Sequence, residues 1–199
     1  CSYCWRIEKH PNNLISDRLV KSGEHWAAPY FSKALEAKNI HDVSPRYLEV
    51  CFSSKCNLKC SYCTPSISSS ILKEYQDLGT YPHDDKNPLE QDDIKRIIHM
   101  EGHGNPYITA FWKWLPEIVN DLKILRITGG EPLLHEDTYK LLEFIKEKDI
   151  DDLELSINTN LCIDERKLNR LIDNLQGLKV DTSIWASIDT FGKQAEYIR

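Results

Sequence analysis

The sequence has no long hydrophobic run, no cluster of basic residues and no secretory signal. Its most apolar stretch, residues 107–119, is interrupted by Lys113 and Glu117 and falls well short of the roughly 18 apolar residues that a membrane-spanning helix needs. Lysine and arginine number 25 against 31 aspartates and glutamates, and the net charge of −6 argues against a nucleic-acid-wrapping surface. The residues after Cys1 are polar, unlike a signal peptide. We therefore expect a cytoplasmic protein that binds neither membranes nor nucleic acid.

The composition is that of a globular protein. The chain has 199 residues, of which 41% are hydrophobic and 28% charged, so it can bury a core. It starts at Cys1 rather than at a methionine, from which we expect that a segment upstream is not included.

Two regions of the chain differ in polarity and in the pattern of their apolar residues. Residues 1–44 are polar and irregular, with one expected helix at 24–38. From residue 45 to 199, short apolar runs alternate with segments of helical period, which is typical of βα units that build a parallel sheet. We expect strands at 47–52, 124–128, 153–157 and 180–188, and helices at 66–78, 135–148 and 164–175. An insertion at 79–122 is expected to hold helices near 90–100 and 108–120.

Cysteine is the most informative residue type. The chain has seven cysteines, an odd number that favours metal binding over a disulfide framework. Cys56, Cys60 and Cys63 form a C-x3-C-x2-C triplet directly after the first expected strand. Thiolates select zinc or iron–sulfur clusters. Four donors close a structural zinc site, whereas three cysteines on a four-iron cluster leave one iron open to a ligand.

The triplet resembles the signature of the radical S-adenosylmethionine (radical SAM) superfamily. The second expected strand runs into Gly129-Gly130-Glu131-Pro132, which is similar to the GGEP motif of the same superfamily. The resemblance implies a partial (βα) TIM-type barrel in which Cys56, Cys60 and Cys63 hold a [4Fe–4S] cluster. The open iron would bind S-adenosylmethionine, and its reductive cleavage would release a 5′-deoxyadenosyl radical that abstracts hydrogen from a substrate. The cofactors carry this chemistry, and no catalytic side chain is assigned.

The resemblance also implies a set of cofactor-binding residues. The two glycines would let the backbone approach the ligand, and the Glu131 carboxylate would bind the methionyl ammonium. Asn160 belongs to a Thr-Asn-Gly-like turn in which Leu161 replaces the glycine. The full set lies at the triad or at the carboxyl ends of expected strands: Tyr62, Gly129, Gly130, Glu131, Pro132, Asn160, Ser187 and Asp189.

The N-terminal stretch carries a second cysteine pair. Cys1 and Cys4, followed by Trp5, Glu8 and a Ser-Asp-Arg sequence at residues 16–18, resemble the segment before the core in radical SAM proteins with a twitch or SPASM-like auxiliary domain. In those proteins such a pair contributes to an auxiliary iron–sulfur cluster. The alternative is a zinc knuckle that includes His10.

The resemblance further implies partners and missing parts. The family core has six βα units and this chain has about four expected strands, so we expect a truncated barrel. A reductant such as flavodoxin or ferredoxin would supply the electron. Auxiliary-cluster relatives modify peptides, proteins or sugars, which makes a peptide or protein the expected substrate.

Other interpretations stay open at this stage. The chain could be a non-catalytic zinc-binding interaction module that uses Cys1, Cys4 and two later cysteines, or a degenerate enzyme that keeps its cluster without cleaving the cofactor. His99 and His103 are a weak zinc candidate. Cys51 and Cys162 are expected to be small core residues, and the aromatic cluster around Trp112 is expected to pack the insertion.

Overall fold

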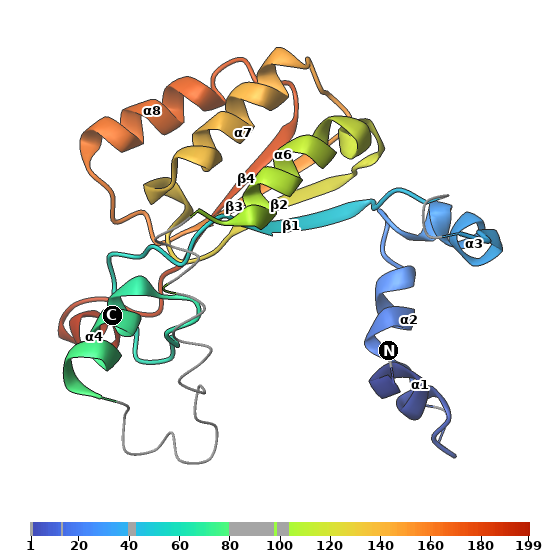
Figure 1. Ribbon diagram of the computed structural model, residues 1–199, viewed down its shortest axis with the longest axis horizontal. Helices are drawn as coiled ribbons and strands as arrows, with labels where there is room; N and C mark the ends of the chain where they lie inside the picture. The colour runs from blue at the N-terminus through green and yellow to red at the C-terminus, as the bar shows by residue number, and fades with distance from the viewer. Residues whose placement is uncertain (1, 13, 40–42, 80–97, 99–103) are drawn as a thin grey trace.

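A sheet of four parallel strands forms the centre of the molecule (Figure 1). The computed structural model describes all residues except 1, 13, 40–42, 80–97 and 99–103. The strands follow the order β1-β2-β3-β4 and span Tyr47–Cys51, Ile124–Thr128, Glu154–Thr159 and Asp181–Ala186. Each neighbouring pair is parallel. The expected strands are confirmed to within two residues at either end, and so is the parallel α/β fold.

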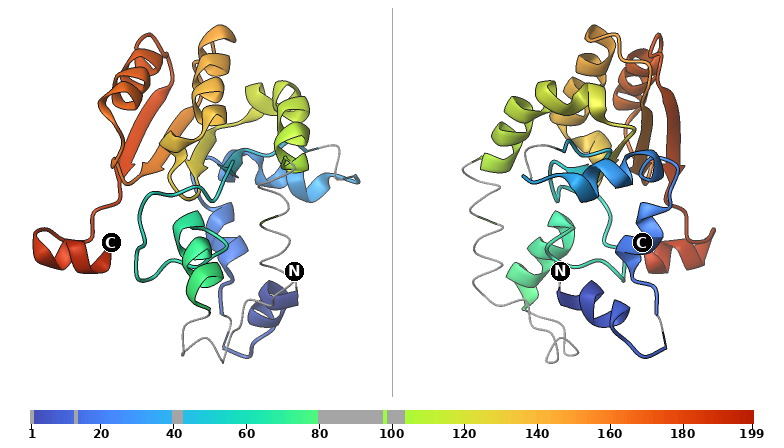
Figure 2. Two further views of the ribbon diagram at one scale, coloured as in Figure 1. Left: turned by 60° about the vertical axis from the view of Figure 1, so that its left-hand side comes forward. Right: turned by 90° about the vertical axis from the view of Figure 1, so that its right-hand side faces the viewer.

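Three helices cover one face of this sheet, as Figures 1 and 2 show. They are α6, α7 and α8, which span Pro106–Ile118, Glu136–Glu147 and Glu165–Leu175. Capping side chains explain where two of them begin. The Asn105 side chain accepts a hydrogen bond from Tyr107 N at 2.9 Å, and Asp164 accepts one from Lys167 N at 2.8 Å. These helices match the expected segments 108–120, 135–148 and 164–175, whereas the segment expected near 90–100 lies outside the described residues.

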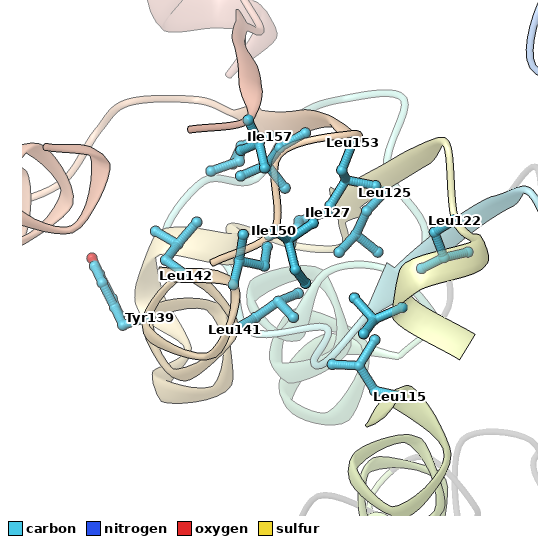
Figure 3. Close-up of a cluster of buried hydrophobic side chains, with 14 of the residues drawn as sticks. Leu115, Leu122, Leu125, Ile127, Tyr139, Leu141, Leu142, Ile150, Leu153 and Ile157 are labelled. Carbon is cyan, nitrogen blue, oxygen red and sulfur yellow. The ribbon is translucent and has the colours of Figure 1, made fainter. Parts of the chain in front are cut away.

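The hydrophobic core lies between the sheet and these helices (Figure 3). Alternate residues of β2 and β3 point into it, as the period of a strand requires. Fully buried side chains from strands and helices meet there, namely Leu115, Leu122, Leu125, Ile127, Leu141, Leu142, Leu155 and Ile157. Their burial fixes the sheet against α6 and α7, and thereby fixes where the strands end.

The opposite face of the sheet is polar. Glu49, Arg126 and Ser156 are in register on β1, β2 and β3, and therefore share this face. Arg126 Nε donates to Asn158 Oδ1 at 2.9 Å, and Thr128 Oγ1 donates to Glu49 Oε1 at 3.1 Å. Because parallel sheets normally bury both faces in apolar contacts, a polar face fits the inner wall of a partial barrel.

The N-terminal region contains three short helices. They are α1, α2 and α3, which span Ser2–Glu8, Asp17–Ser22 and Ala28–Glu36. Only α3 was expected, as part of 24–38. The first two have seven and six residues and bury none of them. Their sequences therefore lack the regular spacing of apolar residues that predicts a helix. Trp26 packs on Tyr47 with ring centroids 5.3 Å apart, which connects this region to β1.

Two further helices, α4 (Ser69–Leu78) and α9 (Lys193–Ile198), lie beyond the carboxyl ends of the strands in Figure 1. The expected helix at 66–78 begins at residue 69 because Ser68 caps it, accepting a hydrogen bond from Ile71 N at 3.4 Å. No helix was expected at the position of α9. Among the described residues, no helix combines the length and apolar character that crossing a bilayer demands.

Candidate functional site

The three cysteines of the triad lie on the loop between β1 and α4. Cys60 is buried, and Cys56 and Cys63 are half-buried. A tight turn brings the last two together, because Cys63 N donates to Cys60 O at 2.9 Å. The start of α4 holds the first: Cys56 N donates to Ser69 Oγ at 3.1 Å, and Ser70 Oγ donates to Cys56 O at 2.7 Å. The loop is therefore fixed by backbone contacts at both ends of the triad.

The thiols influence one another electrostatically. Burial, with a smaller contribution from the charge of Cys60, raises the pKa of Cys63 to about 11. Burial also raises the pKa of Cys56, with smaller contributions from the charges of Cys60 and Glu131. The thiols of Cys56 and Cys63 are thus protonated at neutral pH, so binding of a metal cluster must release protons.

This donor set fits an iron–sulfur cluster better than a single ion. In the parts of the chain that the structure describes, no group of three or more His, Cys, Asp or Glu side chains is placed to hold one metal ion. Four irons space their thiolates more widely than one ion does, and three soft sulfurs on one loop suit such a cluster. The four-cysteine zinc module would need Cys4 beside the triad, but Figure 1 shows α1 far from the loop before α4. That arrangement argues against this module.

The Gly-Gly-Glu-Pro bend packs directly against the chain that leads into the triad. Gly130 N donates to Ser53 O at 3.2 Å, and Glu131 N donates to Lys55 O at 2.7 Å. A Cβ atom on Gly130 would lie 2.4 Å and 2.5 Å from the carbonyl oxygens of Ser54 and Lys55. Gly129 has a φ of +131°, which favours glycine. The glycines therefore permit a close approach to this protein's own backbone, whereas an approach to the ligand was expected.

Glu131 connects the ends of two strands. Its side chain is 1% exposed. The carboxylate accepts hydrogen bonds from Leu133 N at 3.0 Å, from Thr159 Oγ1 at 2.6 Å and from Asn160 N at 2.6 Å. A carboxylate offers about four acceptor sites, so capacity for one further donor is left. The expected contact with the methionyl ammonium stays a prediction, while the structural role is shown. Pro132 is buried at the start of the 3₁₀ helix η4, Pro132–Leu134.

The turn after β3 reaches the triad loop. Asn160 Nδ2 donates to Asn57 Oδ1 at 3.1 Å and lies 4.0 Å from Cys56 Sγ. Leu161 adopts a φ of +57°, so it takes the left-handed conformation that the family's glycine would favour. Cys162 follows it and is exposed, with its carbonyl accepting a hydrogen bond from Asn57 Nδ2. The expectation that Cys162 is a core residue is wrong, because it belongs to this exposed turn.

The remaining expected ligands also gather at this edge. Ser187 N donates to Thr159 O at 2.8 Å, which places the end of β4 beside the end of β3. Tyr62 is 57% exposed, and its hydroxyl donates to Asp189 Oδ2 at 3.0 Å. The structure thus brings together Cys56, Cys60, Cys63 and the expected cofactor residues, whereas Cys4 lies on α1 and Cys1 is outside the described residues.

A cavity of about 1070 Å³ opens beside the same edge. Lys55, Ser69 and His135 are among its lining residues, and none of the triad cysteines is. Burial lowers the pKa of His135, which stacks on Phe52 at a centroid distance of 5.9 Å. Cys51 lines this cavity and is exposed, so its expected core position is also wrong. The cavity therefore borders the loop on either side of the triad without reaching the cysteines themselves.

Several residues of the site were missed in the sequence. Asn57 lies on the triad loop and binds Asn160. The backbone of Arg199 contacts the same loop, and Arg126 lies on the polar face of the sheet. The alternation of polar Arg126 and Thr128 with apolar Leu125 and Ile127 within one strand could have revealed that face. The role of Trp112 as packing is confirmed, since it stacks on Phe52 at 6.3 Å. The pair His99 and His103 lies outside the described residues.

Comparisons with known proteins agree with this arrangement. Curated relatives include the GTP 3′,8-cyclase of Limosilactobacillus fermentum, 31% identical over 77% of this chain and 35% of that protein. The GTP 3′,8-cyclase of Campylobacter lari is 27% identical over 69% of this chain and 36% of its own length. Molybdenum cofactor biosynthesis protein 1 of Dictyostelium discoideum is 28% identical over 89% of this chain and 25% of its own.

This chain therefore spans about a third or less of the relatives it matches. No solved structure matches it. A family model described as the radical SAM superfamily matches residues 50–191, which contain the cysteine triad, the Gly-Gly-Glu-Pro bend and all four strand ends. On this match and on the geometry of the triad, the chain belongs to the radical SAM superfamily.

Proposed function

We propose that this chain is the core of a radical SAM enzyme. Cys56, Cys60 and Cys63 would hold the [4Fe–4S] cluster, and S-adenosylmethionine would bind along the adjoining carboxyl ends of the strands. The bound cofactors supply one chemical event, the one-electron cleavage of the sulfonium to methionine and a 5′-deoxyadenosyl radical. The protein holds the cysteine loop, orients the cofactor and shields the radical from water.

One observation carries the proposal, namely the packing of the glycine bend on the triad loop. The backbone of Gly130 and Glu131 hydrogen-bonds to Ser53 and Lys55, immediately before Cys56. Glu131 in turn fixes the turn at Asn160, whose side chain reaches Asn57 and Cys56. The cluster ligands and the expected S-adenosylmethionine ligands are therefore one connected unit.

The polar face of the sheet supports a place for the substrate. Arg126 is partly buried and uses its Nε on Asn158, while its terminal nitrogens have no partner among the contacts of the described residues. Trp185 shares this face, because it is in register with Asn158 on β4, and it is 59% exposed. An arginine donor fork and an exposed indole on the same face of the sheet suit a substrate that has an anionic group and a flat ring.

We propose a nucleotide substrate of the GTP class. The relatives named above as GTP 3′,8-cyclases support this choice, and so do the charge of Arg126 and the ring of Trp185. A peptide or protein substrate, expected from the resemblance to auxiliary-cluster proteins, has no contact in the described residues that favours it. It stays a prediction, as does a flavodoxin or ferredoxin reductant.

The auxiliary cluster also stays a prediction. The family model begins at residue 50 and does not reach Cys1 or Cys4. Arg18 donates hydrogen bonds to Glu8, which raise the pKa of its guanidinium, and the charge of Cys4 on α1 adds to this effect. A twitch or SPASM-like domain would need donors besides this pair.

The test is anaerobic reconstitution with iron and sulfide, followed by dithionite, S-adenosylmethionine and detection of 5′-deoxyadenosine. We expect 5′-deoxyadenosine from the unchanged chain and from Cys162→Ala, and none from Cys60→Ala. Consumption of GTP that falls in Arg126→Gln while 5′-deoxyadenosine formation persists would support the substrate class. A cluster-loaded chain that forms no 5′-deoxyadenosine would show a degenerate enzyme and overturn the proposal.

A further inference from the structure

The last residues of the chain are bound to the cysteine loop through their backbone. Ser61 N donates to Ile198 O at 2.8 Å, and Lys59 N donates to Arg199 O at 3.4 Å. Both donors flank Cys60. Figure 1 shows the same relation, with the C-terminus lying beside the loop that precedes α4. The segment that follows β4 is thus part of the environment of the triad.

The side chain of Arg199 is held in one place. Its Nε donates to Asp189 Oδ2 at 2.7 Å, and the same oxygen accepts the hydroxyl of Tyr62 at 3.0 Å. The Arg199 side chain is only 15% exposed. The carboxylate therefore fixes two groups at once, the guanidinium and the aromatic ring that precedes Cys63.

The guanidinium also lies close to the cysteines, because residues 198 and 199 are bound on both sides of Cys60 and the Asp189 carboxylate joins Arg199 to the ring that precedes Cys63. Burial lowers the pKa of this guanidinium, but its hydrogen bond to Asp189 and the charge of Cys60 outweigh that effect and raise it. A partly buried cation beside thiolates is screened less than an exposed one.

We propose that Arg199 is a positioning residue for the iron–sulfur cluster: fixed by Asp189, it places a positive charge beside Cys60 and Cys63 and holds Tyr62 against the loop. This inference rests on the proposed cluster. Three thiolates and an added electron make the site more negative, and a fixed cation stabilises that reduced state. The charge and hydrogen bonding around a cluster are among the factors that set its reduction potential.

The experiment is a potentiometric titration of the reconstituted full chain, followed by electron paramagnetic resonance of the reduced cluster. Arg199→Gln removes the charge but keeps the backbone carbonyl that binds Lys59. Arg199→Lys keeps the charge without the planar donor fork. Lys193 is exposed at the start of α9, the helix that Arg199 follows. Lys193→Gln makes the same change in net charge away from the site and is the matched control.

We expect Arg199→Gln to lower the ratio of reduced to oxidised cluster on the order of tenfold at a fixed potential, about 59 mV for one electron. Arg199→Lys should restore most of that ratio, and Lys193→Gln should leave it unchanged. Iron loss to a chelator should be faster in both Arg199 variants, because both weaken the hold on Tyr62. If Arg199 had only a structural role, its substitution would change the rate of iron loss and leave the reduction potential unchanged.

Equal potentials in Arg199→Gln and Lys193→Gln would overturn this inference while leaving the proposed function intact. Failure of the unchanged chain to bind any cluster would overturn both. Should Arg199→Gln not fold, Arg199→Lys decides. A tenfold change in its ratio of reduced to oxidised cluster would show that the charge at this position does not set the reduction potential, and would overturn the inference.

Discussion

The two cysteine-bearing regions of this molecule have similar spacing and different surroundings. Cys60 and Cys63 share a C-x2-C spacing with Cys1 and Cys4. The triad loop is held by α4, by the Gly-Gly-Glu-Pro bend, by the turn after β3 and by the segment after β4. The Cys4 helix is joined to α2 through Glu8, which accepts hydrogen bonds from Ser16 and Arg18.

The difference shows that the spacing of cysteines does not specify the contacts that hold their backbone in place. A cluster site needs its backbone fixed before the metal arrives, because ordering a loop costs about 1–2 kcal/mol per residue. In the triad loop that cost is offset by contacts from α4 and from three segments distant in sequence. In α1 the contacts described above come from residues within about ten positions. The following changes are designed to remove or sharpen this contrast.

The largest effect is expected from Gly130→Ala. The new methyl group would meet the carbonyl oxygens of Ser54 and Lys55 at 2.4 Å and 2.5 Å, so the bend must move away from the triad loop. We expect a loss of about 3 kcal/mol in the free energy of unfolding, together with loss of cluster binding. Chemical denaturation and iron analysis measure the two effects.

Gly23→Ala in the N-terminal region is the matched control. A Cβ there would lie 3.4 Å from Val20 O at an ordinary φ of −87°, so we expect almost no change in stability. Equal effects of the two substitutions would show that the bend is no more constrained than the N-terminal region.

Glu131→Gln should have the next largest effect. The buried carboxylate accepts three hydrogen bonds, and an amide would turn an NH₂ donor toward one of those donors. We expect about 2 kcal/mol of destabilisation and a loosened turn at Asn160. Hydrogen exchange of the Asn160 amide, compared with its rate in Glu8→Gln, measures this. Unchanged protection of that amide would contradict the connecting role of Glu131.

Leu161→Gly should stabilise the protein. Relief of the left-handed conformation at φ +57° outweighs the added freedom of glycine in the unfolded chain, giving a gain of about 0.5–1 kcal/mol. Asp149→Gly is the control at a similar φ of +53°, where aspartate is better tolerated and the gain should be smaller. A thermal melt of both variants is the measurement. A loss of stability in Leu161→Gly would show that the leucine side chain contributes packing that outweighs its strain.

The smallest effect is expected in the N-terminal region on lowering the pH. The hydrogen bonds from Arg18 and Ser16 lower the pKa of Glu8 from 4.5 to about 2. The stabilisation of this contact is therefore complete above about pH 4.5 and is lost as the pH falls toward 2. Arg18 stacks over Trp5 at 3.9 Å, so tryptophan fluorescence should report the change. In Glu8→Gln this transition should be absent, and its persistence would assign it to another group.

The sequence allowed the strands, the three covering helices and the triad site to be predicted, because those features depend on local period and on motif spacing. The contacts that hold the site together could not be read in this way. Arg199 is far from Cys60 in sequence, and no pattern signals that the two meet. Glu131 was expected to be a ligand from its motif, and its structural role was missed because its partner Asn160 lies in the turn after another strand. The helices α1 and α2 bury nothing and so carry no hydrophobic signal.

The most direct test of the central claim is the iron and sulfide content of the anaerobically reconstituted chain, measured alongside Cys60→Ala and Cys4→Ala. We predict roughly four irons assigned to the triad in the unchanged chain, retained in Cys4→Ala and lost in Cys60→Ala. A colourless protein with a single zinc, or iron that survives in Cys60→Ala and disappears in Cys4→Ala, would contradict the account.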